Sequence, residues 1–135
     1  MVAVRIIEGE ERKLIGMRLE MSLTNNRTHN LFQKFIPRKK EITNVVSEDV
    51  FALQHYDLLN FTPQTIFEKW ACVEVTDFNE IPDGMESFLL EPGTYAVFTH
   101  IGSVTDFVKT FRSVLTEYLP TTSYSVDNRP HFEIL

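Results

Sequence analysis

Cysteine, glycine and basic charge are all scarce in this 135-residue chain, and each shortage excludes a class of function. The single cysteine, Cys72, excludes an internal disulfide, so we expect a reducing compartment, the cytoplasm. The five glycines are scattered and form no phosphate-binding loop. Lysine and arginine total 13 against 19 acidic residues, and the resulting formal charge of −6 argues against nucleic-acid binding.

Long apolar runs and metal-ligand patterns are also missing. No segment approaches the roughly 20 apolar residues of a membrane-spanning helix, and the opening MVAVRIIEGEERKL does not resemble a signal peptide. His29, His55, His100 and His131 show no ligand spacing, and Cys72 has no cysteine partner. We therefore expect no membrane insertion, no metal and no other cofactor.

The composition that remains is typical of a globular protein, with 43% hydrophobic and 24% charged residues. A length of 135 residues predicts a single domain covering residues 1–135. Helical spacing predicts one helix that begins near Thr28 and ends or kinks near Ile36, because Pro37 cannot continue it. It predicts a second that Ser103 and Asp106 cap and Pro120 ends. Alternating patterns predict strands at residues 14–22, 49–56, 67–76, 85–90, 94–100, 123–126 and 131–135.

The order of these elements repeats. Strand, helix, strand and strand occupy residues 14–76, and the same order occupies residues 94–135. Two such βαββ halves predict an α+β fold, in which an antiparallel sheet carries the two main helices on one side. The seam between duplicated halves is a usual place for a ligand groove.

The strand FEKWACVEVT at residues 67–76 has two different faces. Ala71 and the two valines predict a face that packs against helices, whereas Trp70 and Glu74 share the other face with Cys72. A ring beside a carboxylate offers an organic cation both a π face and an opposite charge. The alternative to a ligand contact for Trp70 is a half-buried packing role. For Glu74, and for Glu133 in the middle of the last predicted strand, the alternative is a sheet surface that faces water.

Three pieces of sequence together resemble the gyrase-inhibitor-like (GyrI-like) small-molecule-binding family. They are KWACVEV, IPDGMESFLLEPGTYAVFTHIG and DNRPHFEIL, and the resemblance extends over residues 14–135. The family is related to the effector-binding domains of AraC-type and multidrug-responsive bacterial regulators. The resemblance implies two βαββ halves that form a curved sheet, with a ligand groove where they meet. It also implies that aromatic residues line this groove and that an acidic residue near its floor pairs with cationic, often lipophilic ligands.

The resemblance also implies particular ligand-binding residues. Glu133 matches the glutamate of the FE ending, and Trp70 matches the aromatic residue before the VEV strand. Phe35 matches an aromatic residue of the first helix, and Tyr95 matches the tyrosine of the PG-YAVF piece. Strand parity adds two further candidates, Tyr56 and Glu74. The aromatic that usually closes the family's ending is replaced here by Leu135.

The leading hypothesis is a stand-alone effector-binding protein for a cationic, amphipathic small molecule, with no DNA-binding domain of its own. The second is a hydrolase of reactive electrophilic molecules that uses Glu133 as acid or base, so enzyme activity stays an open question. The third is a protein-interaction module whose acidic surface meets a basic protein partner.

Overall fold

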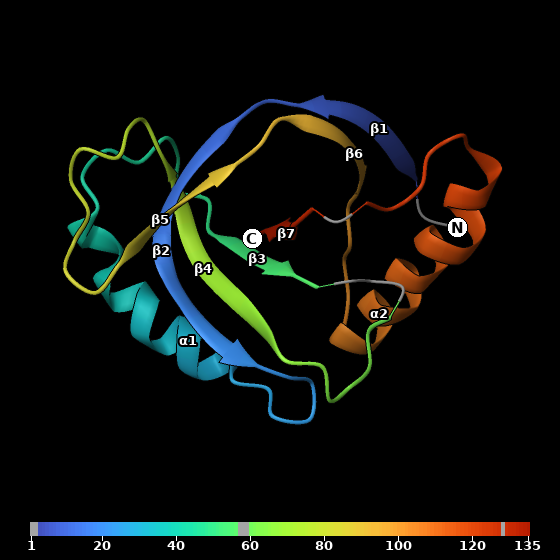
Figure 1. Ribbon diagram of the computed structural model, residues 1–135, viewed down its shortest axis with the longest axis horizontal. Coiled ribbons are helices and arrows are strands. Elements are labelled where there is room, and N and C mark those ends of the chain that lie inside the picture. The colour runs from blue at the N-terminus through green and yellow to red at the C-terminus, as the bar shows by residue number, and fades with distance from the viewer. Residues whose placement is uncertain (1–2, 57–59, 128) are drawn as a thin grey trace. The chain divides into compact units, whose positions relative to one another are not determined.

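Two compact units make up the computed structural model, which describes residues 3–56, 60–127 and 129–135. The smaller unit combines Met1–Glu10 with Pro92–Asp127, and the larger combines Glu11–Glu91 with Asn128–Leu135. Each unit contains its own sheet and its own main helix (Figure 1). The single domain predicted over residues 1–135 stays a prediction.

The smaller unit is built on a two-stranded antiparallel ribbon. Strand β1 (Val4–Gly9) pairs with β6 (Gly93–Phe98), from Val4 opposite Phe98 to Gly9 opposite Gly93. The sequence pattern did not predict β1, because its alternation covers only a few residues. The two strands must pair with each other because a lone strand leaves its backbone groups without hydrogen bonds.

Helix α2 (Val104–Ser113) continues the smaller unit and begins as predicted. The backbone N–H of Asp106 donates to Oγ of Ser103 at 3.1 Å, which confirms the predicted cap. The helix continues through a π-helical turn and a short 3₁₀ turn that ends at Thr121. The ring of Phe107 stacks against the rings of both Phe98 and Phe111, so the apolar side of α2 packs within the smaller unit.

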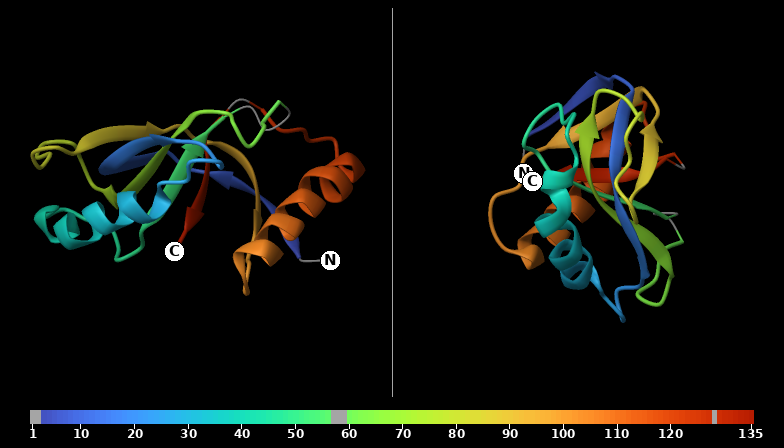
Figure 2. Two further views of the ribbon diagram at one scale, coloured as in Figure 1. Left: turned by 90° about the horizontal axis from the view of Figure 1, so that it is seen from below. Right: turned by 90° about the vertical axis from the view of Figure 1, so that its left-hand side faces the viewer.

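The larger unit contains a five-stranded sheet in which every pairing is antiparallel. Helix α1 (Thr28–Phe35) lies along one side of this sheet, against β2 (Arg12–Met21) and β4 (Phe67–Val75) (Figure 2, left). It continues as a 3₁₀ turn from Ile36 to Glu41, because Pro37 cannot continue an α-helix. The strand order is β5 (Glu86–Leu90), β2 (Arg12–Met21), β4 (Phe67–Val75), β3 (Phe51–His55) and β7 (His131–Ile134).

Both faces of this sheet are packed. The helix face, defined here as the face that carries Ala71 and Val73, forms a core with Leu31 and Phe35 of α1. The opposite face, which carries Trp70 and Cys72, forms a second core. Its other members are Leu14, Phe51, Leu53 and Leu90, with Phe88 and Phe132 packed against them. The prediction that Ala71 and Val73 face a helix is confirmed.

The predicted α+β class, with two main helices and antiparallel strands, is confirmed. Two details differ. Residues 123–126 form no strand, and β7 pairs with β3, so the last strand of the second predicted half belongs to the sheet of the first. The turn predicted at residues 127–130 includes Asn128, which lies outside the described residues.

The helices formed by the described residues are all too short or too polar for a membrane crossing.

Candidate functional site

Strand register decides which candidate residues share a face, because residues paired across antiparallel strands point to the same side. Trp70 pairs with Arg18 on β2 and with Leu53 on β3, and Leu53 pairs with Phe132 on β7. Glu133 follows Phe132 and pairs with Ala52 on the helix face. The expectation that Trp70 and Glu133 line one groove is therefore wrong, because they lie on opposite faces of the sheet.

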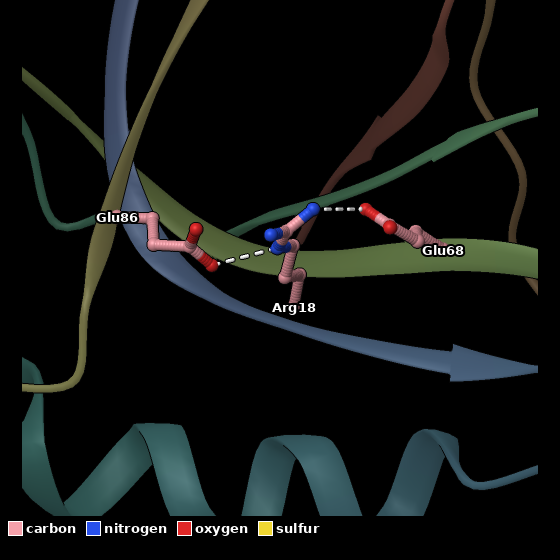
Figure 3. A network of polar contacts seen from close by, with 3 residues as sticks. All are labelled: Arg18, Glu68 and Glu86. Carbon is pink, nitrogen blue, oxygen red and sulfur yellow. Dashed lines mark hydrogen bonds and ion pairs between the residues drawn. The ribbon is translucent and has the colours of Figure 1, made fainter.

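Trp70 already has a cation of the protein's own beside its ring. The guanidinium of Arg18 lies 5.9 Å from the centroid of Trp70, and the ring of Phe88 lies 5.4 Å away. Arg18 Nη1 donates to Glu68 at 2.8 Å and its Nε donates to Glu86 at 2.7 Å (Figure 3). These contacts hold Arg18 in place, and Trp70 is only 8% exposed.

Glu74 is paired internally in the same way. Nη1 of Arg12 donates to its carboxylate at 2.7 Å, and the Arg12 guanidinium lies 5.3 Å from the centroid of Phe51. On this face Arg12 is the cationic partner of the Glu74 carboxylate and of the Phe51 ring, and Arg18 is the cationic partner of the Trp70 ring. The face that the sequence suggested for a ligand cation therefore contains protein cations instead.

A different group of candidate residues meets on the helix face. We call Tyr56, Lys69 and Glu133, with the rings of Phe61 and Phe67, the Glu133 cluster. The Tyr56 ring stacks on Phe61 at a centroid distance of 4.0 Å, and it lies 5.1 Å from Phe67. Glu133 acts electrostatically on both Tyr56 and Lys69. The cluster combines an aromatic surface with one carboxylate and one amine, all half-buried except Phe67, which is buried.

Burial and Glu133 together set the protonation of this cluster. Burial raises the pKa of Tyr56, and the negative charge of Glu133 raises it further, so the phenol stays a hydrogen-bond donor. Burial lowers the pKa of Lys69, and the charge of Glu133 opposes that effect. Burial, with smaller contributions from His55 and Lys69, lowers the pKa of His131 to about 4. His131, whose ring meets the Tyr56 ring at 4.6 Å, is therefore neutral near neutral pH.

Phe35 is buried in the core of the larger unit, and Tyr95 belongs to the smaller unit. Phe35 is 0% exposed in the core under α1, so the ligand contact that the resemblance implied has no accessible surface. Tyr95 belongs to β6 of the smaller unit, where it pairs with Ile7 and its ring lies over Gly9. Its ligand role stays a prediction.

Lys69, Phe61 and Phe67 were missed as site residues. Alternation along β4 places Lys69 on the same side as Ala71 and Val73, a position where a lysine is unusual, and that was the available signal. The sequence did not show that β7 places Glu133 on the same face as Lys69, across β3. Only the pairing of β7 with β3 establishes that neighbourhood.

Metal and cavity features do not coincide with this cluster. Among the described residues, no group of three or more histidine, cysteine, aspartate or glutamate side chains is arranged to hold a metal ion. A shallow pocket of about 280 Å³ lies elsewhere in the larger unit, along β2 and α1. Neither Glu133 nor Tyr56 is part of that pocket, and we base the candidate site on the chemistry of the cluster. The pocket is lined by Met17, Arg18, Leu19, Leu31, Lys34, Gly84 and Glu86.

Cys72 is expected to be chemically inert in the folded protein. It is 0% exposed, burial raises its pKa to about 12, and its thiol donates to the carbonyl of Phe51 at 3.7 Å. Because the thiolate is the reactive form, a maleimide or disulfide reagent should label the native protein very slowly. Labelling in urea should be rapid, and equally rapid labelling of native protein would contradict this burial.

Comparison with known proteins identifies relatives of this chain. The model of the family described as integron-associated effector binding protein matches residues 5–135. The transcriptional regulator BrlR of Pseudomonas aeruginosa is 29% identical over 115 residues, which cover 85% of this chain and 41% of the regulator. The chain thus corresponds to less than half of the length of that curated relative.

Two solved structures have the same fold. An integron cassette protein from Vibrio cholerae superposes with a TM-score of 0.67 at 18% identity, covering 97% of this chain and 86% of the other. SAV2435, in a structure with bound tetraphenylphosphonium, superposes with a TM-score of 0.63 at 15% identity, covering 96% and 81%. At these identities the likeness establishes the fold.

Proposed function

Because this chain belongs to the integron-associated effector binding family, with its GyrI-like fold, we propose that it binds a small amphipathic molecule at the Glu133 cluster. The family membership supports a ligand-binding role. The proposal adds the site and the ligand's chemistry, an apolar body carrying a cationic group. One observation carries it: Glu133 and the stacked rings of Tyr56 and Phe61 lie together on the helix face.

The chemistry of the cluster fits such a ligand. The rings of Tyr56 and Phe61 offer flat apolar surface to the body of the ligand, and Glu133 offers a negative charge to its cationic group. Ligand sites are commonly apolar with a few polar groups that set orientation. The tetraphenylphosphonium bound to SAV2435, a lipophilic cation on a similar fold, supports this choice of ligand class.

The first test removes the carboxylate charge. Glu133→Gln should weaken binding of tetraphenylphosphonium by about tenfold, equivalent to about 1.4 kcal/mol, because the cation loses its opposite charge while shape is kept. Isothermal titration calorimetry against a panel of lipophilic cations measures the change. Unchanged affinity across the whole panel would remove Glu133 from the site.

Variants on the opposite face supply matched controls. Glu74→Gln neutralises a carboxylate that is paired with Arg12, and Trp70→Phe trims a ring that Arg18 covers. Both should leave affinity within about twofold of the native protein, because neither side chain is on the helix face. A loss in these variants, with Glu133→Gln unaffected, would favour the ligand roles originally predicted for Trp70 and Glu74.

The two rival hypotheses remain predictions. Mass spectrometry of the ligand after incubation separates binding from hydrolysis, since intact ligand at long times counts against a hydrolase. A partner protein attracted by acidic surface should dissociate as ionic strength rises. Residence in the cytoplasm, which rests on the lone Cys72, also stays a prediction.

A further inference from the structure

Lys69 has no role in the proposed function as stated, although it lies within the same cluster. Lys69 on β4 pairs with Gln54 on β3, which pairs with His131 on β7. Lys69 therefore points to the helix face, as Glu133 does. It is half-buried, whereas most lysines are exposed, and an opposite charge nearby offsets part of the cost of covering its amine.

The two charges attract each other at a distance rather than in direct contact. The ion pairs found among the described residues, with N···O distances up to 4.0 Å, do not include Lys69 with Glu133. Strand β3 separates their strands, and two strand spacings amount to roughly 10 Å between backbones. The field of Glu133 nevertheless reaches the amine of Lys69.

The side chains of β3 between them are nearly closed to solvent. Ala52 is 3% exposed and Gln54 is 7% exposed, whereas Lys69 and Glu133 are half-buried. A ligand that reaches this part of the sheet therefore meets a positive and a negative group on the same face, about two strand spacings apart. The adjoining His131 is neutral near neutral pH and adds no charge.

We propose that Lys69 determines the charge specificity of the site, so that the preferred ligand is zwitterionic: an amphipathic molecule with a cationic group for Glu133 and an anionic group for Lys69. This inference rests on the proposed function and refines its ligand class. A pure cation gains attraction from Glu133 and meets repulsion from Lys69. A dipolar head group is attracted by both, and half-burial strengthens each interaction.

The test compares two probes in the native protein and in Lys69→Met, so that the difference in probe size is the same in both proteins and only the charge at residue 69 changes. Octyltrimethylammonium and the octyl sulfobetaine share a tail and a quaternary nitrogen, and the second adds a sulfonate. Calorimetry below the micelle-forming concentrations should show the native protein binding the sulfobetaine about tenfold more tightly, a preference of about 1.4 kcal/mol. Lys69→Met should reverse the order, because it weakens sulfobetaine binding and strengthens ammonium binding.

Control variants separate charge from shape. Lys69→Arg keeps the charge and should keep the native preference. Lys34→Met removes an exposed lysine of α1 that lines the shallow pocket, and should leave the preference unchanged. Thermal unfolding of every variant checks that each is folded at the temperature of the titration.

The outcomes distinguish failure of this inference from failure of the proposed function. If both probes bind and Glu133→Gln weakens them, but Lys69→Met leaves their ratio unchanged, the role of Lys69 is refuted and the site survives. If neither probe nor tetraphenylphosphonium binds, or Glu133→Gln changes nothing, the site is refuted and the role of Lys69 with it.

Discussion

Replacing Phe35 by alanine should lower the free energy of unfolding by about 3–5 kcal/mol, among the largest effects of any core substitution in this chain. The side chain is 0% exposed at the end of α1 and packs in the core with Leu31, Ile15 and Val73. Alanine would remove a whole ring and leave a void that a sheet on one side and a helix on the other cannot easily close.

Urea denaturation monitored by circular dichroism measures this loss, and the neighbouring position supplies the control. Ile36 is 48% exposed, so Ile36→Ala should change stability by less than about 0.5 kcal/mol. If Phe35→Ala lowered the free energy of unfolding only as much as this control does, and also weakened ligand binding, Phe35 would be a site residue rather than a core residue. The expected result is the reverse, a destabilised protein whose folded fraction still binds ligand.

Gly16→Ala should also destabilise the larger unit strongly, by about 3 kcal/mol or more, since overpacking beside backbone lies at the severe end of such effects. A Cβ at Gly16 would overlap the carbonyl oxygen of Ala71 and lie 2.6 Å from Cα of Cys72. The obstruction is backbone of the paired strand β4, which cannot rotate away as a side chain can. Strands β2 and β4 would have to separate at the centre of the sheet.

Thermal unfolding and hydrogen exchange of the β2 and β4 amides measure this effect. Gly9→Ala is the matched control, because a Cβ there would chiefly meet the ring of Tyr95, at 2.9 Å, and a ring can turn aside. The control should therefore lose clearly less stability. Equal, small losses in the two variants would mean that β2 and β4 do not approach as closely as this structure indicates.

Local patterns in the sequence predicted the individual elements well. Ser103 and Asp106 marked the start of α2, and Pro37 marked the end of α1, because capping and the missing proline N–H act within a few residues. Alternation also assigned Trp70 and Ala71 correctly to different sides of β4. These features depend only on neighbours in the chain.

The same local logic failed on the second face of β4. A strand that carries Trp70, Cys72 and Glu74 on one side suggested a face open to ligand. The central position of β4, between β2 and β3, instead surrounds that face with side chains of its neighbours. Arg12 and Arg18 supply the positive charges that the sequence pattern led us to expect from a bound ligand.

The sequence by itself determined the helices, most of the strands, the family and the alternation of Glu133 with Phe132 within the last strand. Only the tertiary structure decided that this strand joins β3, and therefore that Glu133 faces Tyr56 and Lys69 instead of Trp70. The reason is physical: alternation distinguishes two sides of a strand, but a shift of one residue in pairing exchanges them. Register is set by hydrogen bonds between segments far apart in the chain.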